Sequence, residues 1–445
     1  MNLKKNWGKV YARFFAVIVS ITAPMVNALK GLFPVGKVFL IADSNNWIRM
    51  NYDKIVGKGI FSRNIFIRIP FVPHEKQKVF TIHGDFRDTE YKGVNLYRVS
   101  EYNICVDLDI FPAKINFEYE RHRAVIAEWF AVSAECIDFF EKIVIQKKPD
   151  KILISQGHNF DAAIVRALSC LHGFGVVAVE NTFNKNKIVW DDISGITVNK
   201  NLAKNFYWKY RDFVTAAAAE LYVNEYLENI KQMKVGEHQT PLAVAAKSDK
   251  KTVLFIGQVY TDSSVLFGIN TFSCPVAIID QLVDYCLAND YHLIIKLHPK
   301  EATGNNILSR PYNNLTYRRI TEQEGLLEKI TSGGFLLDNG LYDTYSLIDS
   351  ADVCVTVNSQ AGLEALIKGK DVIVCGQGYY TGLGFAFEAL NRVCLSSFLD
   401  MVIKQGVSVL DRNEINKFFY IISEKYFMTR DEGCVETLLQ GAQIG

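Results

Sequence analysis

A histidine–proline pair is the first feature of this sequence that could do chemistry. His298 and Pro299 follow an apolar run that ends in Lys296-Leu297, so we expect the histidine where a strand gives way to a loop. Proline fixes its own backbone angle and therefore shapes such a turn. An imidazole in this place can donate a hydrogen bond to a phosphate oxygen, and Lys296 is a donor-binding candidate beside it. A loop histidine that is satisfied within the protein is the structural alternative.

A polar cluster after the apolar run 353–357 is the second candidate. Ser359 and Gln360 stand where a helix is expected to begin, and free N–H groups at a helix start attract anions. Ser359 can cap the helix and also bind a phosphate oxygen. Glu364, one turn further on, could accept a hydrogen bond from a ribose or a base. Capping alone for Ser359 and a solvated carboxylate for Glu364 are the alternatives.

Two other stretches of the same half could contribute to a phosphate site. Gln258 follows the apolar run 252–256 and offers both a donor and an acceptor, and Ser263 comes soon after it. The run 371–374 is followed by a glycine-rich loop, 375–384. That loop matches neither the Walker A sequence nor the three-glycine dinucleotide pattern, so by itself it indicates little.

Carboxylates lie near predicted strand ends in the first half of the chain. Glu180 follows the run 176–179, and the adjacent pair Asp191 and Asp192 lies within 190–197. Glycosyl transfer through an oxocarbenium-like transition state uses paired carboxylates. Aspartates that satisfy the N–H groups of a turn are the alternative for an Asp-Asp pair before Ser-Gly. Three residues just after the run 151–155 are acceptor-side candidates: Gln156, His158 and Asn159.

Short apolar runs, each followed by turn residues and a helix-like stretch, must position these side chains. Strands rich in Val, Ile and Leu that alternate with helices are typical of parallel sheets covered on both faces. We therefore predict an α/β chain of two Rossmann-like, doubly wound domains that face a central cleft, with ligands beyond the carboxyl ends of the strands. The predicted strands span residues 37–42, 78–82, 151–155, 176–179, 252–256, 292–297, 334–337, 353–357 and 371–374.

The length of 445 residues fits two domains of about 200 residues each. An Ala-rich helical stretch, 215–229, precedes a segment without apolar periodicity, 232–251, which we interpret as the linker. The predicted parts are a basic and apolar N-terminal segment, 1–34; an N-terminal Rossmann-like acceptor and catalytic domain, 35–245; and a C-terminal Rossmann-like nucleotide-binding domain with C-terminal helices, 246–445.

Charge and cysteine usage limit the partners and the compartment. The net charge of +1 provides no general attraction for nucleic acid. Nine cysteines, an odd number without a Cys-x-x-Cys pair, indicate reduced thiols and a cytoplasmic location. The sequence has no cluster with metal-ligand spacing, so we expect no metal or other cofactor and assign the donor phosphate to His298 and backbone N–H groups.

The N-terminal segment has three open interpretations. Residues 14–29 carry no charge and follow four basic residues, but Pro24 and Asn27 interrupt the run. A bilayer span needs about 20 apolar residues, more than this run offers. The segment is a membrane-surface element at the inner face of the inner membrane, an ordinary buried helix, or a signal or anchor.

Together these pieces resemble the retaining β-Kdo transferases of bacterial capsule and O-antigen assembly, the KpsC and WbbB type. Each motif alone is unspecific, whereas their order and spacing are not, and the resemblance covers residues 150–390. The motifs, in chain order, are 180–183, 191–196, Gly257-Gln258-Val259 with Asp262 and Ser263, Lys296-Leu297-His298-Pro299, 358–366 with Gly369-Lys370, and 379–384.

The resemblance implies a GT-B fold, CMP-β-Kdo as donor, and transfer with retention onto a lipid-linked oligosaccharide through an aspartyl-glycosyl intermediate. It assigns the CMP phosphate to His298 and Ser359. Asp192 has the Asp-x-x-Gly-Ile spacing of the nucleophile, with Asp191 as the alternative, and Glu180 corresponds to the acid/base residue. The capsule enzymes read Glu-Asp-Gly-Phe where this chain has Glu-Asn-Thr-Phe at 180–183, so the acceptor and the register of the nucleophile stay open.

Two other functions compete with this one. A CDP-glycerol or related polyol-phosphate transferase also combines two domains with a His-Pro loop, but attack at phosphorus needs no aspartate nucleophile. A glycan-binding or assembly protein with a catalytically dead fold is the non-enzymatic alternative. Nucleotide preference separates these functions, because a bound nucleotide stabilises the native state by mass action.

Overall fold

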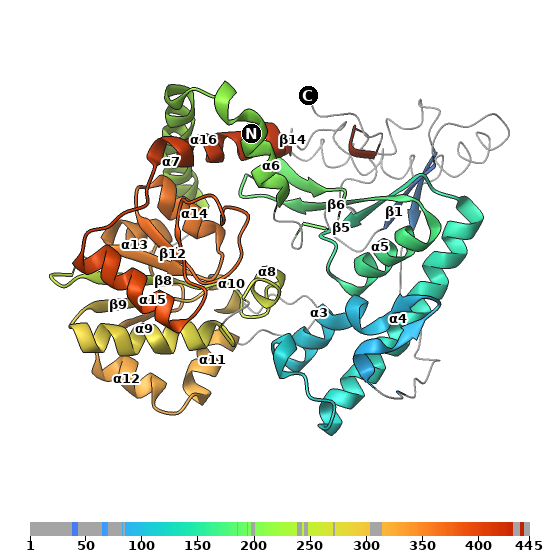
Figure 1. Ribbon diagram of the computed structural model, residues 1–445, viewed down its shortest axis with the longest axis horizontal. Helices are drawn as coiled ribbons and strands as arrows, with labels where there is room; N and C mark the ends of the chain where they lie inside the picture. The colour runs from blue at the N-terminus through green and yellow to red at the C-terminus, as the bar shows by residue number, and fades with distance from the viewer. Residues whose placement is uncertain are drawn as a thin grey trace, which may run out of the picture. The chain divides into compact units, whose positions relative to one another are not determined.

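The computed structural model describes residues 38–42, 65–69, 82, 85–184, 186–193, 195–196, 201–237, 243, 248–269, 272–302, 314–429 and 437–439. The chain divides into two compact units that are both discontinuous in sequence (Figure 1). The first unit contains Met1–Leu108, Ile115–Asn199 and Phe427–Gly445, and the second contains Asp109–Lys114 and Lys200–Tyr426. The predicted segment 1–34 lies outside the described residues, as does all of the predicted strand 78–82 except Ile82.

A six-stranded sheet forms the centre of the first unit, in the order β14-β7-β6-β5-β1-β2. The pairs β6–β5, β5–β1 and β1–β2 are parallel, whereas β7 runs antiparallel to both β6 and β14. The strands are β1 (Val38–Ala42), β2 (Ile65–Ile69), β5 (Lys151–Ser155), β6 (Gly175–Asn181), β7 (Lys187–Asp191) and β14 (Met428–Thr429).

In the described part of the first unit, three helices pack beside this sheet. Helix α5 (Phe160–His172) lies directly on β5 and β6, and both α3 (Leu96–Leu108) and α4 (Glu120–Lys147) pack on α5 (Figure 1). The buried positions of α5, among them Ile164, Val165 and Leu168, recur at helical spacing and give the helix its apolar face. A small hairpin of β3 (Glu90–Tyr91) and β4 (Val94–Asn95) precedes α3.

The second unit contains an entirely parallel six-stranded sheet with the order β10-β9-β8-β11-β12-β13. Numbered within the unit, this is the order 3-2-1-4-5-6 of a Rossmann fold. Every residue of β8 and β11 is buried, as expected for strands covered on both faces. The strands are β8 (Thr252–Ile256), β9 (His292–Lys296), β10 (Leu336–Asp338), β11 (Val353–Thr356), β12 (Asp371–Val374) and β13 (Phe387–Glu388).

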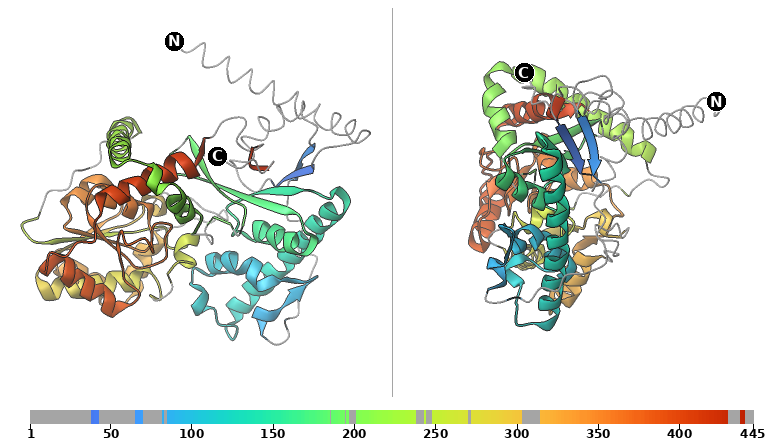
Figure 2. Two further views of the ribbon diagram at one scale, coloured as in Figure 1. Left: turned by 45° about the horizontal axis from the view of Figure 1, so that its top comes forward. Right: turned by 90° about the vertical axis from the view of Figure 1, so that its right-hand side faces the viewer.

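Helices cover both faces of this sheet because right-handed crossovers to the two sides of β8 place their helices on opposite faces. Figures 1 and 2 show α9 and α12 on one face, and α14 with α16 on the other. Helix α7 packs on α16 and forms an outer layer. The helices are α6 (Asn201–Tyr210), α7 (Ala216–Glu237), α8 (Ser263–Leu266), α9 (Pro275–Asn289), α10 (Pro299–Ala302), α11 (Leu315–Glu322), α12 (Leu326–Ser332), α13 (Thr344–Ser350), α14 (Gln360–Ile367), α15 (Arg392–Leu399) and α16 (Arg412–Ile421).

The two sheets confirm the predicted fold class, an α/β chain with two Rossmann-like units of the kind that build GT-B-like folds. The predicted domain boundary at 245/246 falls inside the second unit, since α6 and α7 pack against α16. The cleft between the domains stays a prediction. In the part of the chain that the structure describes, no helix combines the length and apolarity needed to cross a bilayer.

Candidate functional site

The strand order of the second unit reverses between β8 and β11, which lie side by side. Successive connections leave these two strands in opposite directions, so their loops diverge and leave room for a ligand at the carboxyl edge. The residues after Ile256 and Thr356 therefore stand at the topological switch point of the sheet. Gln258 and Ser359 were both predicted as donor-binding residues, and the fold places both at this edge.

The two switch-point loops are joined by a pair of amides. Gln258 Nε2 donates to Asn358 Oδ1 at 2.9 Å and to Ser264 Oγ at 3.2 Å, and the Asn358 N–H donates to Gln258 Oε1 at 3.1 Å. Both polar atoms of the Gln258 side chain are thus engaged within the protein. Gln258 fixes the relative position of the two loops, and its predicted contact with a nucleotide stays a prediction.

Asn358 is central to this site, although the sequence reasoning did not select it. Its Nδ2 donates to the carbonyl oxygens of Ser264, at 2.6 Å, and of Gln377, at 3.0 Å, and only 5% of the residue is exposed. Gln377 belongs to the glycine-rich loop that follows β12, so one amide joins the loops of three strands. The available signal was its place in sequence, since it stands two residues after β11 as Gln258 does after β8.

Ser359 caps helix α14, as predicted from its type and place. Its Oγ accepts from the Ala361 N–H at 3.2 Å, and its carbonyl accepts from the Tyr380 hydroxyl at 2.8 Å. Tyr380 is fully buried and reaches this carbonyl across Gly362, where a Cβ would lie 2.4 Å from the tyrosine oxygen. The glycine-rich loop is therefore packed against the start of α14, the place where an anion is expected.

Glu364 is held by neighbours instead of projecting into solvent. Its Oε1 accepts from Gln360 Nε2 at 3.0 Å and from the Tyr226 hydroxyl at 3.5 Å. Burial and the negative charge of Glu364 raise the pKa of Tyr226 and of Tyr345 well above 10, so both phenols stay protonated and can act as donors. Gln360, Glu364 and the two tyrosines form a polar group one turn into α14.

Lys296 is committed to a buried ion pair. Its Nζ lies 2.6 Å from Asp338 Oδ2 and donates to the Tyr342 carbonyl at 3.0 Å, and the two charged residues are 4% and 1% exposed. The other oxygen of Asp338 accepts from the Leu341 N–H at 2.7 Å. This pair holds the loop after β10 against β9, which gives Lys296 a structural role beside its predicted contact with the donor.

His298 presents a neutral imidazole, and within the described part of the chain the only hydrogen bond of its ring is made by Nδ1. Its Nδ1 accepts from the Lys300 N–H at 3.2 Å, so the ring proton of the neutral form resides on Nε2. Burial, and after it the charge of Lys300, lowers the pKa of His298 below its usual value, while Asp262 acts in the opposite direction. Ser263, the other predicted residue here, is 8% exposed at the start of the short helix α8. An Nε2–H at this edge can donate to an anionic oxygen.

In the first unit, the residues just after β5 contact Glu180 of β6 and the loop after β7. Gln156 adopts φ 55° and its Nε2 donates to Glu180 Oε1 at 2.7 Å, while its carbonyl accepts from the Ile196 N–H at 3.0 Å. Gly195, with φ 96°, lies against Gly157, since a Cβ at Gly157 would lie 2.9 Å from the Gly195 Cα. The structure thus brings the predicted residues Gln156 and Glu180 together.

The two adjacent aspartates have different environments. Asp191 is 1% exposed, and its Oδ1 accepts from the N–H groups of Ile193 at 2.9 Å and Gly195 at 2.7 Å. Asp192 is exposed at the surface of the same loop. The turn interpretation therefore applies to Asp191, whereas Asp192 is exposed, and the choice of nucleophile stays a prediction.

Glu180 and Asp191 point to the same face of the sheet. In the antiparallel pair of β6 and β7, Glu180 is opposite Val189 and Asp191 is opposite Ala178. Because side chains alternate along a strand, residues two apart share a face and the two carboxylates are diagonal neighbours. A basic residue that the sequence reasoning missed is close by: Arg166 Nη1 donates to the Gly157 carbonyl at 2.9 Å. Burial lowers the pKa of Arg166, and the charge of Asp191 acts in the opposite direction.

The remaining acceptor-side candidates line the start of α5. His158 is 9% exposed and its ring meets that of Tyr102 edge-on, with centroids 4.6 Å apart. Asn159 occupies the cap position of α5 without a capping hydrogen bond, and Asn103 Oδ1 accepts from the Phe160 N–H at 2.9 Å in its place. Among the described side chains, no group of three or more His, Cys, Asp and Glu residues could hold a metal ion.

The fold and the two strand-edge sites define an α/β protein with two Rossmann-like units. A family model described as "Capsule polysaccharide biosynthesis protein" matches residues 196–391, slightly less than half of the chain. This match includes the switch-point residues of the second unit and confirms the capsule-biosynthesis part of the predicted resemblance.

Two curated proteins are related in sequence. Lipopolysaccharide-processing protein LpsZ of Rhizobium meliloti is 30% identical over 155 residues, which cover 35% of this chain and 31% of LpsZ. Capsule polysaccharide modification protein LipA of Neisseria meningitidis serogroup B is 25% identical over 290 residues, which cover 60% of this chain and 38% of LipA. The chain thus spans about a third of the length of these relatives.

Similar solved structures share little sequence with this chain. The β-Kdo 2,7 transferase of Thermosulfurimonas dismutans KpsC has a TM-score of 0.41 and 14% identity, with 86% of this chain and 90% of that chain covered. UDP-GlcNAc 2-epimerase of Neisseria meningitidis has a TM-score of 0.36 and 12% identity, with 91% and 99% covered. The fold class therefore rests on the two sheets of the chain itself.

Proposed function

We propose that this chain is a retaining glycosyltransferase that moves Kdo from CMP-β-Kdo to a lipid-linked surface-glycan acceptor. The observation that carries the proposal is the neutral His298, whose Nδ1 accepts a hydrogen bond so that Nε2 carries the proton, in a Rossmann sheet whose switch-point loops are fixed by Gln258 and Asn358. The match of this unit to capsule polysaccharide biosynthesis proteins supports a sugar nucleotide as its ligand.

In this proposal the second unit holds the departing CMP. His298 donates to a phosphate oxygen, and the N–H groups at the start of α14 with Ser359 supply further donors. Glu364 accepts from the ribose or the cytosine, and the hydroxyl of Tyr226 holds its carboxylate in place. No metal ion is needed, because these donors compensate the charge that develops on the leaving phosphate.

The carboxylates of the first unit act on the sugar. Asp192 attacks the anomeric carbon, the bond from that carbon to the phosphate oxygen breaks, and CMP leaves with the electron pair. Glu180, oriented by Gln156, then removes the proton of the acceptor hydroxyl, which displaces Asp192. Two inversions restore the original configuration. The exposed position of Asp192 supports it as the nucleophile, and the two hydrogen bonds of buried Asp191 support a role in shaping the loop.

The covalent step is tested by intact-mass spectrometry of the protein incubated with CMP-Kdo generated in place and no acceptor. We expect one added Kdo on the wild type and none on Asp192→Asn, which should still fold and bind CMP. Adduct formation by Asp192→Asn would assign the nucleophile elsewhere. A product with inverted configuration would exclude the double displacement.

The donor is tested by the shift in melting temperature with CMP, CDP and UDP. A ligand at 100 times its Kd stabilises the native state by about 2.7 kcal/mol, so the preferred nucleotide is the one that raises the melting temperature most. Stabilisation by CMP supports the proposal. Stabilisation by CDP alone would favour a polyol-phosphate transferase, and no response to any of the three would favour a glycan-binding protein.

A further inference from the structure

A buried carboxylate lies three residues after His298. Glu301, in helix α10, is 1% exposed, and its Oε1 accepts from the Tyr260 N–H at 2.7 Å and from the Thr316 hydroxyl at 3.0 Å. Its Oε2 accepts from the Thr316 N–H at 3.1 Å. One side chain thereby joins the turn that carries His298 to the loop after β8 and to the start of α11.

The same side chain acts on both sides of the candidate phosphate site. The Glu301 N–H donates to the His298 carbonyl at 3.0 Å, so the carboxylate and the histidine belong to one tight turn. Tyr260 lies two residues before Asp262, whose Oδ1 accepts from the N–H and hydroxyl of Ser264, the partner of Gln258. Glu301 is therefore connected to the imidazole on one side and to the switch-point amides on the other.

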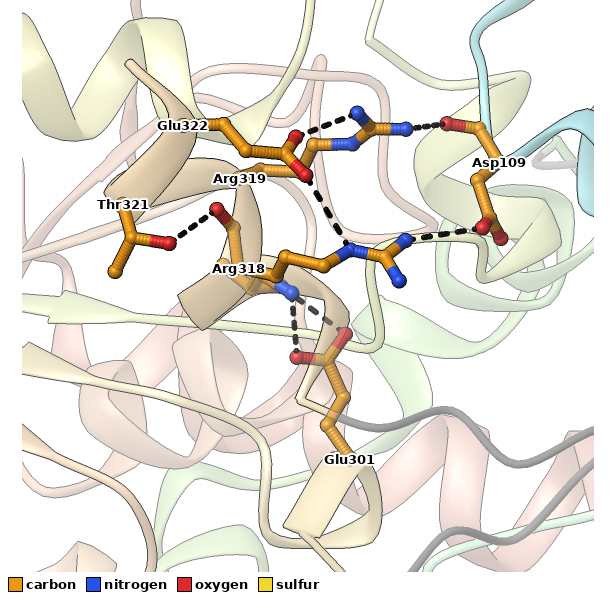
Figure 3. A network of polar contacts seen from close by, with 7 residues as sticks. Asp109, Glu301, Arg318, Arg319, Thr321 and Glu322 are labelled. Carbon is orange, nitrogen blue, oxygen red and sulfur yellow. Dashed lines mark hydrogen bonds and ion pairs between the residues drawn. The ribbon is translucent and has the colours of Figure 1, made fainter. Parts of the chain in front are cut away.

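A group of charged residues forms ion pairs with one another between Asp109 and helix α11, which begins beside Glu301. Asp109 Oδ2 lies 3.1 Å from Arg318 Nη2, and the Asp109 carbonyl accepts from Arg319 Nη2 at 2.9 Å (Figure 3). Glu322 pairs with both arginines from the other side, at 3.6 Å and 2.7 Å. The ring of Phe111 meets the Tyr260 ring edge-on at 5.3 Å. The short segment Asp109–Lys114 thus covers the loop that Glu301 holds.

The burial of a carboxylate costs desolvation free energy, which a neutral side chain joining the same loops would not cost. Burial raises the pKa of Glu301, while its hydrogen bonds from Tyr260 and Thr316 lower it. Removal of such a group leaves buried N–H donors without an acceptor, which costs more than the hydrogen bonds contribute. Such a cost is expected where a binding site depends on the relative position of the joined loops, and one of these loops carries His298.

We propose that Glu301 is a positioning residue of the nucleotide site, which sets the direction of the His298 imidazole by fixing its turn to the loop after β8. This inference rests on the proposed function of the site. Glu301 does not contact the nucleotide. Its loss should weaken nucleotide binding only through the misplacement of His298.

The experiment is a double-mutant cycle on CMP affinity, measured by calorimetry with the full chain. Glu301→Gln retains the shape but places an NH₂ group against an N–H donor, so we expect about tenfold weaker CMP binding, the size of one lost hydrogen bond. The variant with both Glu301→Gln and His298→Ala should bind CMP as His298→Ala does, because the effect passes through the imidazole. Glu328→Gln, a change of an exposed carboxylate on α12, is the matched control and should leave affinity within twofold.

Several outcomes would overturn the inference. Full CMP affinity in folded Glu301→Gln, or additive losses in the double variant, would show that Glu301 does not act through His298. If Glu301→Gln fails to fold, Thr316→Val is the alternative, because it removes one hydrogen-bond donor to Glu301 and keeps the carboxylate. This variant should weaken CMP binding to a smaller extent. Unchanged CMP binding in Thr316→Val would then refute the inference. A wild type without CMP affinity would instead refute the proposed function. In that case hydrogen exchange of the Tyr260 amide still tests the positioning role, and it should be faster in Glu301→Gln than in the wild type.

Discussion

Replacement of Lys296 by methionine distinguishes a structural lysine from a ligand of the donor. The ammonium lies 2.6 Å from Asp338, and both groups are almost completely buried. Removal of one partner of a buried ion pair typically costs 3–5 kcal/mol because the other charge stays buried. Asp338 keeps the N–H donors of Leu341 and Tyr342, so we expect a loss of unfolding free energy at the lower end of this range, about 3 kcal/mol. For a unit of this size that is a fall in melting temperature of about 6–12 °C.

The assay combines thermal unfolding with calorimetric CMP binding at a temperature where both proteins are folded. We expect Lys296→Met to lose stability and to retain most of its CMP affinity. The added change Asp338→Asn should restore part of the stability, because it removes the unpaired charge. Lys329→Met is the matched control, since Lys329 pairs with Asp284 at 2.7 Å on the surface, where such pairs contribute little. A Lys296→Met protein that melts like the wild type and no longer binds CMP would refute this reasoning.

Three other changes have defined outcomes. Burial lowers the pKa of His298, and its neutral form is the proposed donor, so wild type and His298→Gln should show the same pH dependence of CMP affinity between pH 6.5 and 8, that of the phosphate alone; calorimetry tests this, and a loss of affinity with rising pH in the wild type alone would show that the imidazolium binds CMP. Gly362→Ala should lower the melting temperature, because a Cβ there lies 2.4 Å from the Tyr380 hydroxyl oxygen, and Tyr380→Phe in the same chain should recover part of the loss. Asp191→Asn should lower stability by about 1–2 kcal/mol through weaker hydrogen bonds to its loop, whereas Asp192→Asn should melt like the wild type; equal melting temperatures would contradict the assignment of roles.

The strongest strands of both sheets were predictable from sequence. β5, β8 and β12 have the predicted bounds, because a continuous apolar run between turn residues describes a strand buried on both faces. β7 and β14 were missed, since β7 contains lysine, tryptophan and aspartate and β14 has two residues. β14 exists because of antiparallel pairing with β7, which is distant in sequence, and no local pattern reports this pairing; β7 pairs in addition with the neighbouring strand β6.

The types of the candidate residues and their places near strand ends could be predicted from sequence, but their hydrogen-bond partners could not. Strand ends identified His298, Ser359, Glu364 and Glu180 as polar residues near a sheet edge. The pairing of Gln258 with Asn358 spans 100 residues, so it depends on the neighbouring positions of β8 and β11. Glu301 appears in sequence as an ordinary charged residue of a surface turn, and only the fold shows that it is buried. The different burial of Asp191 and Asp192 could likewise not be predicted from two adjacent residues of the same type.

The strand β14 has a consequence for the order of events during synthesis. It pairs with β7 from the far end of the chain, so the first unit's sheet lacks its last strand until residue 429 has been made. Synthesis proceeds at about 5–20 residues per second, so the roughly 240 residues between β7 and β14 take about 12–50 s. During that time the outer edge of β7 offers unpaired N–H and C=O groups to other strands. A chain shortened before Phe427 would keep that edge open permanently, and its tendency to aggregate would reflect an unfinished sheet and not a lost active site.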